Sequence, residues 1–570
     1  MFRTKIISSL EKPFLEESFD KYERLENLSA LLGERVSVQL LYTYELDDEG
    51  LYQRLCTPVL SGSLAKYATI RSVRSVPVVK PVPWGYFEGE GEGFLRTTPG
   101  LYPDMLEPLS YDGRFRIMRG ALESLWIDID IPDDLELVGE QALTVTSIID
   151  VPDKYERVIV DTKVIGVDTL TIDVIGASLP EQKLKFTQWF YCDCLASYYG
   201  VPVWSDRHFE IIESFARCAV KNGINMLLTP VFTPPLDTEV GGERLTTQLV
   251  GITKSNGKYR YNWSLFDRWV KMCDRVGVKY LEISHFFTQW GAEHAPKIMA
   301  TVDGEYKRIF GWDTDAHGEE YKEFLRSFLR SFLAHVRKLG IDKRCYFHIS
   351  DEPQSRHLDS YKKSKRIVSR LLSDYVIMDT LSDYKFYRRG IVKTPIPSND
   401  HIEPFIKAGV DGLWTYYCCG QYEGVSNRFH AMPSARNRSI GMQMYKYNIV
   451  GFLHWGYNFY NNCSSVNPIN PFLDASGEKW VSAGDAHSVY PAPDGTPYES
   501  IRLKVFADAI TDMRAMQKCE EYYSHAEVVS AIEDILGYEL RFDTCLLDSK
   551  TLLAVREKIN AMIKSAINKA

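Results

Sequence analysis

The chain has 570 residues, of which 45% are hydrophobic and 25% charged, and its net charge is −9 at pH 7. A chain of this length is too long for a single hydrophobic core, so we expect two or three domains of ordinary globular composition. The negative charge argues against a nucleic-acid partner, because no excess of Lys and Arg is present to neutralise phosphates. Aromatic residues reach 13%, and their flat apolar faces suit sugars and bases alike.

Neither a membrane span nor an export signal is evident in the sequence. No stretch approaches 18 uninterrupted apolar residues, and residues 1–13 lack the apolar core of a secretory signal. The 11 cysteines are scattered without a CxxC pair, although Cys418 and Cys419 are adjacent. This pattern is unlike a zinc or disulfide framework. We therefore expect reduced thiols, no metal, no membrane insertion and a cytoplasmic location.

Residues 1–183 consist of short runs rich in Val, Thr, Tyr and Ile, separated by Gly, Pro and Asp. Their spacing predicts an antiparallel β-sandwich. The clearest strand pattern is at 126–131, where apolar and polar residues alternate strictly, as is typical of a half-buried strand. Further strands are predicted at 36–44, 68–76, 115–119 and 141–149. No group of catalytic residues is apparent in this region.

In residues 184–523, apolar strand patterns alternate with amphipathic helical patterns, which indicates parallel βα units. The clearest helix is predicted at 319–339, where large apolar residues recur every four positions. Eight such units predict a (β/α)8 TIM barrel. The eight strands are predicted at 186–191, 225–229, 279–285, 346–350, 375–380, 392–396, 413–417 and 450–455.

Two further segments complete the predicted organisation. Residues 242–262 contain a Ser-Asn-Gly turn signal and predict a hairpin inserted after the second barrel strand. The last fifty residues have a polar helical pattern, and we expect them to pack outside the barrel. The predicted domains are a β-sandwich over 1–183, the catalytic barrel over 184–523 and a helical C-terminal extension over 524–570.

Polar and aromatic side chains follow almost every predicted barrel strand at its carboxyl end, where α/β barrels hold their active sites. The fourth strand runs into two adjacent carboxylates, Asp351 and Glu352. Any one such residue is more often structural, as a helix cap or a core side chain. Their recurrence at six or seven strand ends instead indicates a carbohydrate site. The candidates for substrate binding are Asp193, Asp237, His285, Trp290, Asp379, Tyr416, Trp455, Asn458 and Asp485.

The motifs of metal and cofactor sites are missing from the sequence, which contains no HxH or HExxH spacing, no GxGxxG after a strand and no Walker sequence. We therefore predict neither a metal nor a cofactor. The placement of the acids then favours one mechanism among glycosidases. Retaining glycosidases of the common type need two carboxyl groups flanking the scissile bond, and the seventh strand at 413–417 contains none.

Two adjacent acids suit a reaction in which the 2-acetamido group of the substrate supplies the nucleophile. In that reaction its carbonyl oxygen attacks C1, and Glu352 protonates the leaving oxygen. Asp351 holds the acetamido N–H and stabilises the developing positive charge. Tyr416 is placed on the seventh strand as a hydroxyl donor to the acetamido oxygen.

Five segments of the predicted barrel carry unusual combinations of aromatic, acidic and glycine residues. They are QWFYCDCLA at 188–196, LTPVFTPPLDT at 228–238, HISDEP at 348–353, GFLHWGYN at 451–458 and GDAHSVYP at 484–491. Together these segments resemble glycoside hydrolase family 123 and the larger DUF4091 group around it. The resemblance implies an N-terminal β-sandwich, a (β/α)8 barrel and exo-acting β-N-acetylgalactosaminidase activity. It also implies an adjacent Asp-Glu pair working by substrate assistance, which corresponds to Asp351 and Glu352.

Under this hypothesis the partner is a glycan or glycoconjugate fragment with β-linked N-acetylgalactosamine at its non-reducing end, and no nucleic acid is involved. Two alternatives stay open. One is a β-hexosaminidase of other preference, such as a β-N-acetylglucosaminidase, with discrimination at the axial 4-hydroxyl by Asp485 or the Trp290 loop. The other is a catalytically silent sugar-binding relative, against which the intact acid pair argues.

Overall fold

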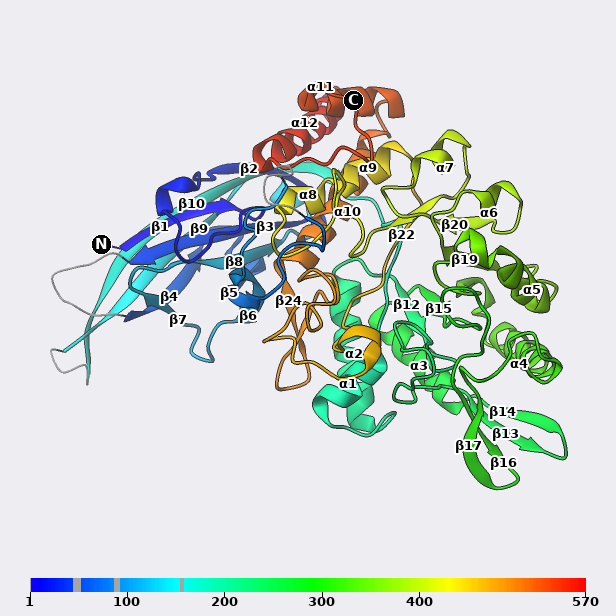
Figure 1. Ribbon diagram of the computed structural model, residues 1–570. Helices are drawn as coiled ribbons and strands as arrows, with labels where there is room; N and C mark the ends of the chain where they lie inside the picture. The colour runs from blue at the N-terminus through cyan, green and yellow to red at the C-terminus, as the bar shows by residue number, and fades with distance from the viewer. Residues whose placement is uncertain (1, 45–52, 87–92, 154–157, 570) are drawn as a thin grey trace. The chain divides into compact units, whose positions relative to one another are not determined.

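The computed structural model describes residues 2–44, 53–86, 93–153 and 158–569. The chain divides into two compact units (Figure 1). The first contains Met1–Gln182, Ser426–Lys446 and Tyr498–Ala570, and the second contains Lys183–Val425 and Tyr447–Pro497. The first compact unit thus combines the N-terminal segment with two segments from later in the chain. The three predicted domains are continuous ranges, and they stay a prediction.

Two β-sheets form the strand-rich part of the first unit, and their neighbouring strands are antiparallel except for the parallel pair β2 and β10. One sheet orders β1 (Phe2–Ser8), β3 (Arg35–Tyr44), β8 (Leu122–Asp130), β5 (Ala68–Val78) and β6 (Gly100–Pro108), and β24 (Pro497–Ser500) pairs with β6. The other orders β2 (Asn27–Leu32), β10 (Ile159–Ser178), β9 (Gly139–Pro152), β4 (Gln53–Ser61) and β7 (Phe115–Met118). Apolar residues of both sheets, among them Leu40, Ile127, Leu143 and Leu170, share one buried cluster.

Strand β8 differs from its prediction, because both of its faces are buried rather than one. Ile127 and Ile129 face the shared core as the alternation predicts, but Asp128 on the opposite face is also covered. Its carboxylate accepts a hydrogen bond from the Trp126 indole at 2.8 Å and pairs with Arg71 and with Lys504. Burying a charge requires such partners, and Lys504 lies more than 370 positions away in the sequence, so alternation alone could not reveal it.

The second unit is built on parallel strands ordered β20, β19, β18, β15, β12, β11, β22 and β21. Their bounds are Thr394–Ile396, Val376–Thr380, Cys345–Phe347, Tyr280–Ile283, Met226–Thr229, Lys185–Gln188, Gly451–His454 and Trp414–Tyr416. A parallel bridge joins Ser398 to Tyr416 between the outermost strands. The Tyr416 amide donates to Pro397 O at 3.2 Å, and the Asn399 amide donates to Tyr416 O at 2.9 Å. The sheet is therefore a nearly closed barrel.

Helices connect these parallel strands, but they are unequal in length. The strands up to β19 are linked by α1 (Cys192–Tyr199), α2 (Asp206–Lys221), α3 (Ser264–Val276), α4 (Glu319–Lys338) and α5 (Leu358–Val368). The next connections carry only the short helices α6 (Lys385–Arg388) and α7 (Glu403–Lys407). The helices predicted near 432–447 and 500–522 are α8 (Ser434–Arg438) with α9 (Ile440–Lys446) and α10 (Ile501–Cys519), which belong to the first compact unit.

Helix α4 illustrates how the sequence pattern becomes packing. Phe324, Phe328 and Phe332, each four positions apart, are fully buried, and successive rings stack at 6.3 and 5.4 Å. Phe232 packs on this row with its centroid 4.5 Å from that of Phe328. Burial of a large aromatic side chain contributes roughly 1.5–3 kcal/mol. The row therefore anchors α4 to the chain segment that follows β12.

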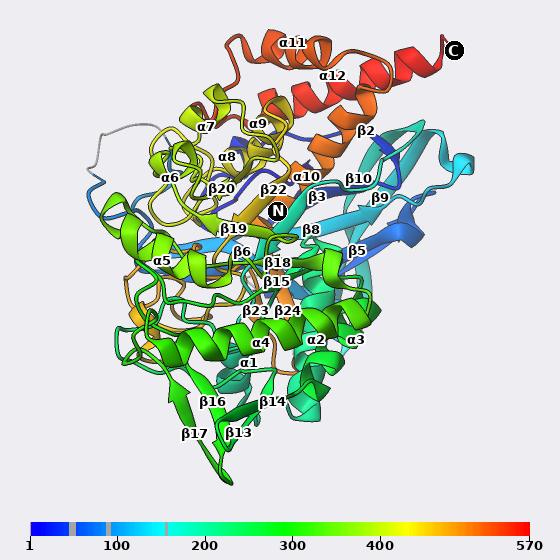
Figure 2. The same cartoon turned by 90° about the vertical axis from the view of Figure 1, so that its right-hand side faces the viewer.

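The predicted hairpin is present as β13 (Gly251–Ser255) and β14 (Lys258–Asn262), which turn at Asn256 and Gly257 with φ of 51° and 73°. It extends through β16 (Ile298–Val302) and β17 (Glu305–Phe310) into a small sheet that lies beside α4 (Figures 1 and 2). The last residues form α11 (His525–Leu536) and α12 (Ser549–Ile567). In the first unit α12 packs against β2 and β10. The sequence predicts a position outside the barrel, and the structure adds that this helix covers a sheet of the first unit. Among the described residues, no helix combines the length and apolar character needed to span a bilayer.

Candidate active site

A pocket of about 200 Å³ lies within the second unit, lined by residues that follow the carboxyl ends of the barrel strands. Pockets for drug-sized ligands are usually about 300–1,000 Å³. This pocket is therefore sized for a single sugar ring rather than for a length of chain. Its lining residues are Trp189, Asp237, Trp290, Asp351, Glu352, Thr380, Tyr416, Cys418, Cys419, Leu453, Trp455, Trp480 and Val481.

The chain that leaves β18 is held rigidly where it carries the acid pair. The amides of Ile349 and Ser350 both donate to the Asp379 carboxylate, at 2.8 and 3.3 Å. Glu352 has a left-handed backbone with φ of 42°, a conformation that costs a non-glycine residue about 1–3 kcal/mol. Its amide donates to Thr380 O at 3.1 Å, so the neighbouring strand β19 supports the strained residue. Two adjacent carboxyl groups are thereby turned into the same pocket.

Each carboxyl group of the pair receives one hydroxyl donor from a neighbouring strand. Thr380 Oγ1, at the end of β19, donates to Asp351 Oδ1. Tyr416 Oη, at the end of β21, donates to Glu352 Oε1 at 2.7 Å. Burial, together with the charge of Glu352, raises the pKa of Asp351 well above its usual range, although the Thr380 hydroxyl opposes this shift. Burial and the neighbouring acid therefore favour the protonated form of Asp351.

Aromatic rings form one wall of the pocket. The Trp455 indole donates to Asp485 Oδ2 at 2.8 Å, which fixes the ring orientation. The Trp480 ring lies edge-on to Trp455 at 5.5 Å, and Phe459 packs behind both at 5.1 and 5.9 Å. Trp290, with a left-handed φ of 57°, is 45% exposed and lines another part of the pocket. These rings offer flat apolar surfaces beside the acid pair.

A buried polar chain lies beneath the pocket. Glu282 accepts hydrogen bonds from the Trp189 indole at 2.8 Å and from His348 Nε2 at 2.7 Å. Burial opposes protonation of His348, but hydrogen bonds to Asp379 and Glu282 raise its pKa to about 9. His285 stacks on His348 with ring centroids 4.3 Å apart, and burial holds its pKa well below the usual range. The His348 imidazole therefore lies between the carboxylates of Glu282 and Asp379, which favour its cationic form.

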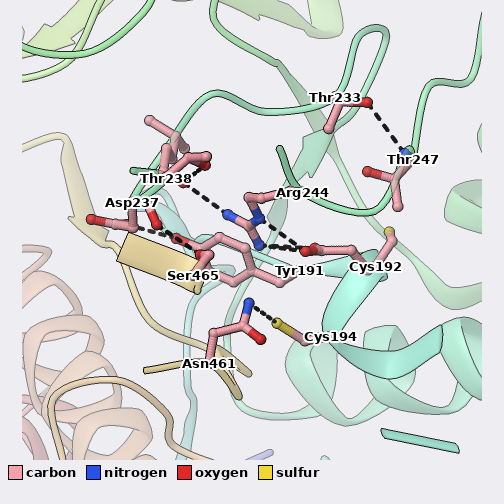
Figure 3. A network of polar contacts seen from close by, with 12 residues as sticks. Tyr191, Cys192, Cys194, Thr233, Asp237, Thr238, Arg244, Thr247, Asn461 and Ser465 are labelled. Atoms are coloured by element: carbon pink, nitrogen blue, oxygen red, sulfur yellow. Dashed lines mark hydrogen bonds and ion pairs between the residues drawn. The ribbon is translucent and has the colours of Figure 1, made fainter. Parts of the chain in front are cut away.

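Asp193 and Asn458 are not among the residues that line the pocket, and they bind other parts of the protein. Asp193, in the first turn of α1, forms a buried bidentate ion pair with Arg244 at 2.7–2.9 Å. The Arg244 guanidinium also lies 4.9 Å from the centre of the Tyr191 ring, and Figure 3 shows these two side chains together. The Asn458 amide binds the backbone of Tyr191 in both directions, at 2.9 and 3.0 Å. Both predicted residues thus brace the loop that follows β11.

Asp237 brings a third carboxyl group into the pocket, on the loop after β12 (Figure 3). Its backbone is left-handed, with φ of 47°, and is fixed from two sides. The Asp237 amide donates to Gln289 Oε1 at 2.9 Å, and Ser465 Oγ donates to Asp237 O at 2.7 Å. Tyr191 Oη donates to Asp237 Oδ2 at 3.4 Å. Burial raises the pKa of Asp237 to about 6. The positive charge of Arg244 opposes this shift, and the charge of Glu352 adds to it.

One protein-family model matches the region of the chain that contains the acid pair and most of the barrel strands. The family model described as "Glycoside hydrolase 123, catalytic domain" matches residues 189–519, more than half of the chain. The chain belongs to glycoside hydrolase family 123. It is therefore a glycosidase, and the matched range contains every lining residue of the pocket. Comparison with curated proteins gives no match.

One solved structure supports the fold of this family 123 member. A family 123 glycoside hydrolase from Clostridium perfringens, studied for glycolipid glycan hydrolysis, covers 100% of this chain and 98% of its own at 16% identity, with a TM-score of 0.71. A family 2 glycosyl hydrolase from Bacteroides cellulosilyticus covers 82% of this chain and 46% of its own at 11% identity and a TM-score of 0.25. A putative beta-galactosidase from Bacteroides fragilis covers 85% and 59% at 12% identity and a TM-score of 0.29. The first of these supports the whole-chain fold, and the others carry no argument.

The predicted site residues of this family 123 enzyme fall into two groups. Those that line the pocket are Asp237, Trp290, Asp351, Glu352, Tyr416 and Trp455. Those that are not among its lining residues are Asp193, His285, Asp379, Asn458 and Asp485. Of these, Asp485 contacts the lining residue Trp455, and the other four, in the same order, contact Arg244, His348, Ile349 and Tyr191. The assigned roles in catalysis and substrate binding stay predictions for both groups.

Sequence reasoning missed several lining residues. Thr380 is the last residue of one predicted strand, and Cys418 and Cys419 follow another, so the strand-end rule could have included them. Trp480 is different, because it lies in a long irregular loop after β22 whose sequence gives no periodic signal. Within the part of the chain that the structure describes, no three His, Cys, Asp or Glu side chains are grouped as metal ligands.

Proposed function

We propose that this family 123 enzyme releases β-linked N-acetylgalactosamine from the non-reducing end of a glycan by substrate-assisted, retaining catalysis. The observation that carries the proposal is the adjacent pair Asp351 and Glu352 in a pocket of about 200 Å³. A pocket of this size favours the terminal residue of a chain over an internal one. The glycolipid glycans named for the Clostridium perfringens enzyme suggest the class of substrate to test here.

The first chemical step assigns one task to each acid. The acetamido carbonyl oxygen attacks C1 while the bond from C1 to the leaving oxygen breaks, and Glu352 gives its proton to that oxygen. Asp351 accepts the acetamido N–H and offsets the positive charge that forms on the oxazolinium ring. In the second step water attacks C1, Glu352 takes a proton from it, and the ring reopens. Two inversions at C1 return the original configuration.

The proton of the pair must lie on Glu352 when this reaction begins, because Asp351 has to accept the acetamido N–H. Two neighbours favour an ionised Asp351. Burial and the charge of Glu352 raise the pKa of Asp351. The hydrogen bond that Thr380 donates to Asp351 Oδ1 and the positive charge of His348 both lower it. A substrate N–H adds a third such interaction. Binding of the acetamido sugar therefore prepares the acid as well as the nucleophile.

Trp455 and Tyr416 are proposed to hold the terminal sugar between them. The Trp455 ring, fixed by Asp485, would lie under the apolar face of the sugar. Tyr416 Oη, now bonded to Glu352, would also reach the acetamido oxygen. A structure with bound N-acetylgalactosamine tests both contacts, and a Trp455 ring more than about 6 Å from the sugar would contradict the first.

A second mechanism deserves a test because Asp237 lines the same pocket as Glu352 and comes from a different strand. Two carboxyl groups across a sugar define an ordinary retaining glycosidase, in which one forms a covalent glycosyl intermediate. We favour a different role for Asp237, as the acceptor of hydrogen bonds from the sugar hydroxyls. Its carboxylate already accepts from a hydroxyl, that of Tyr191. Asp237 is also held in a strained, braced turn, which suits recognition.

The decisive experiment compares Glu352→Gln, Asp351→Asn and Asp237→Asn on p-nitrophenyl β-N-acetylgalactosaminide, the matching glucosaminide and the plain β-galactoside. We expect Glu352→Gln to lower kcat by about 10² to 10⁴, with a smaller loss on activated leaving groups. Asp351→Asn should affect only acetamido substrates strongly, and a GalNAc-thiazoline should bind more tightly than substrate.

Four outcomes would contradict this proposal. Efficient hydrolysis of the plain β-galactoside would remove the acetamido group from the mechanism. A covalent glycosyl adduct on Asp237, detected by mass spectrometry, would establish the second mechanism instead. Faster turnover of the glucosaminide would assign the enzyme to the β-hexosaminidases of other preference. Turnover by none of the substrates, with sugar still bound, would indicate a catalytically silent relative.

A further inference from the structure

The pocket contains two thiols from consecutive residues. Cys418 and Cys419 both line it, in the company of Asp351 and Glu352, and both are half-buried. The described chain has no other pair of adjacent cysteines. Neither thiol has a part in the proposed reaction, which raises the question of what this pair can bind.

Local structure explains why both thiols meet in one place. Cys418 lies two residues beyond Tyr416, the last residue of β21. The chain then turns, with the Gln421 amide donating to Cys418 O at 3.2 Å and the Cys418 amide donating to Gln421 Oε1 at 2.9 Å. A hydrogen bond links the two thiols. The turn thus holds two sulfur atoms close together at the pocket wall.

We propose that Cys418 and Cys419 form a dithiol site for trivalent arsenicals, whose occupation closes the pocket to substrate. An arsenoso group, R–As=O, condenses with two thiols to form two As–S bonds. Both thiol protons leave with the arsenical oxygen as one water, so no oxidant or reductant is required. Arsenic is a soft acceptor, and soft acceptors select sulfur ligands over the carboxylates nearby.

Selectivity for bridging reagents over simple alkylating agents follows from the surroundings of the pair. The hydrogen bond to Cys419, burial and the charges of Glu352 and Asp485 raise the pKa of the Cys418 thiol. The thiolate is the nucleophile in alkylation, so a raised pKa slows that reaction. A bridging reagent gains from two bonds at once. The exposed Cys463, also in the second unit, provides the matched thiol for comparison.

The test uses the full chain with phenylarsine oxide as the probe. Wild-type protein should take up one equivalent, and the adduct should survive an excess of a monothiol but be removed by 2,3-dimercaptopropanol. Alkylation in denaturant followed by peptide mapping should find Cys418 and Cys419 protected. C418S and C419S should each lose the monothiol-resistant adduct, whereas C463S should keep it. Protected thiols elsewhere, or resistant adducts in both single variants, would overturn the dithiol site.

Closure of the pocket is tested in a separate experiment. Its outcome does not depend on whether the substrate proposed above is correct. Where a hydrolysed substrate is found, the rate should fall in proportion to the fraction of protein carrying the adduct, each variant being compared with its own untreated rate. If no substrate is found, the tryptophan fluorescence of the protein, to which Trp189, Trp290, Trp455 and Trp480 of the pocket contribute, should change on binding in wild type and not in C418S. An adduct on both thiols with an unchanged rate or unchanged fluorescence would contradict closure.

Discussion

The proposed role of Asp237 makes a quantitative prediction about pH. Its pKa is raised to about 6 by burial and by the charge of Glu352. The carboxylate form therefore makes up about 90% of the enzyme at pH 7 and about 10% at pH 5. If only the carboxylate recognises the sugar hydroxyls, this group alone should lower kcat/KM roughly tenfold between pH 7 and pH 5, since kcat/KM reports ionisation of the free enzyme.

The variant Asp237→Asn isolates this contribution from those of the acid pair. A hydrogen bond to a charged group is worth about 1.5–3 kcal/mol, so kcat/KM at pH 7 should fall roughly 10- to 150-fold. The fall in kcat/KM near pH 6 should disappear from the pH profile of this variant. Because Asp237 also raises the pKa of Asp351, the limb that belongs to the acid pair should move to lower pH in the variant.

The assay is kcat/KM for an aryl N-acetylgalactosaminide between pH 4.5 and pH 8, with Asp411→Asn as a control. Asp411 is an exposed carboxyl group of the same unit. The control should reproduce the wild-type profile. A limb near pH 6 that persists in Asp237→Asn would refute the reasoning, because that limb would then belong to another group. A loss confined to kcat, with the same pH dependence, would also refute it.

Three further predictions concern neighbours of the acid pair and of the braced loop. Tyr416→Phe removes the 2.7 Å hydrogen bond to Glu352, the proposed acid, and should lower kcat/KM roughly 10- to 150-fold, with unchanged circular dichroism. Arg244→Met leaves Asp193 buried without its cation and should cost about 3–5 kcal/mol of unfolding free energy in a denaturant titration; the double variant with Asp193→Leu should recover much of the loss. Thr380→Val removes a hydrogen bond that lowers the pKa of Asp351, so the acid-pair limb of the kcat/KM profile should move to higher pH.

The barrel was predictable because its strands are buried on both faces and appear in the sequence as short apolar runs bounded by turns. The positions of Asp351 and Glu352 in the pocket could be predicted from strand ends alone, as could those of Tyr416 and Trp455. Asp193 also stands at a predicted strand end, but it is not among the residues that line the pocket. Its partner Arg244 lies 51 positions later in an irregular stretch, and no local pattern connects the two.

Other features required the folded chain. Asp237 was predicted as a site residue, but a strand-by-strand count of acids could not show that it shares a pocket with Glu352. The buried polar face of β8 depends on Lys504, far away in the sequence. These interactions join segments that meet only through tertiary packing, and local periodicity carries no information about them.

The first unit has a consequence for the order in which the protein can fold during synthesis. The segment around β2 cannot complete its contacts until the ribosome has made nearly the whole chain, because Ser29 in β2 bonds to Glu557 and Asn560 in α12, and Glu34 pairs with Arg556. The strands of the barrel are complete by residue 454. We therefore expect the enzymatic half to assemble on the nascent chain while the N-terminal sheets still lack their covering helix. Truncation before residue 549 should accordingly leave a chain whose barrel forms and whose amino-terminal sheets aggregate.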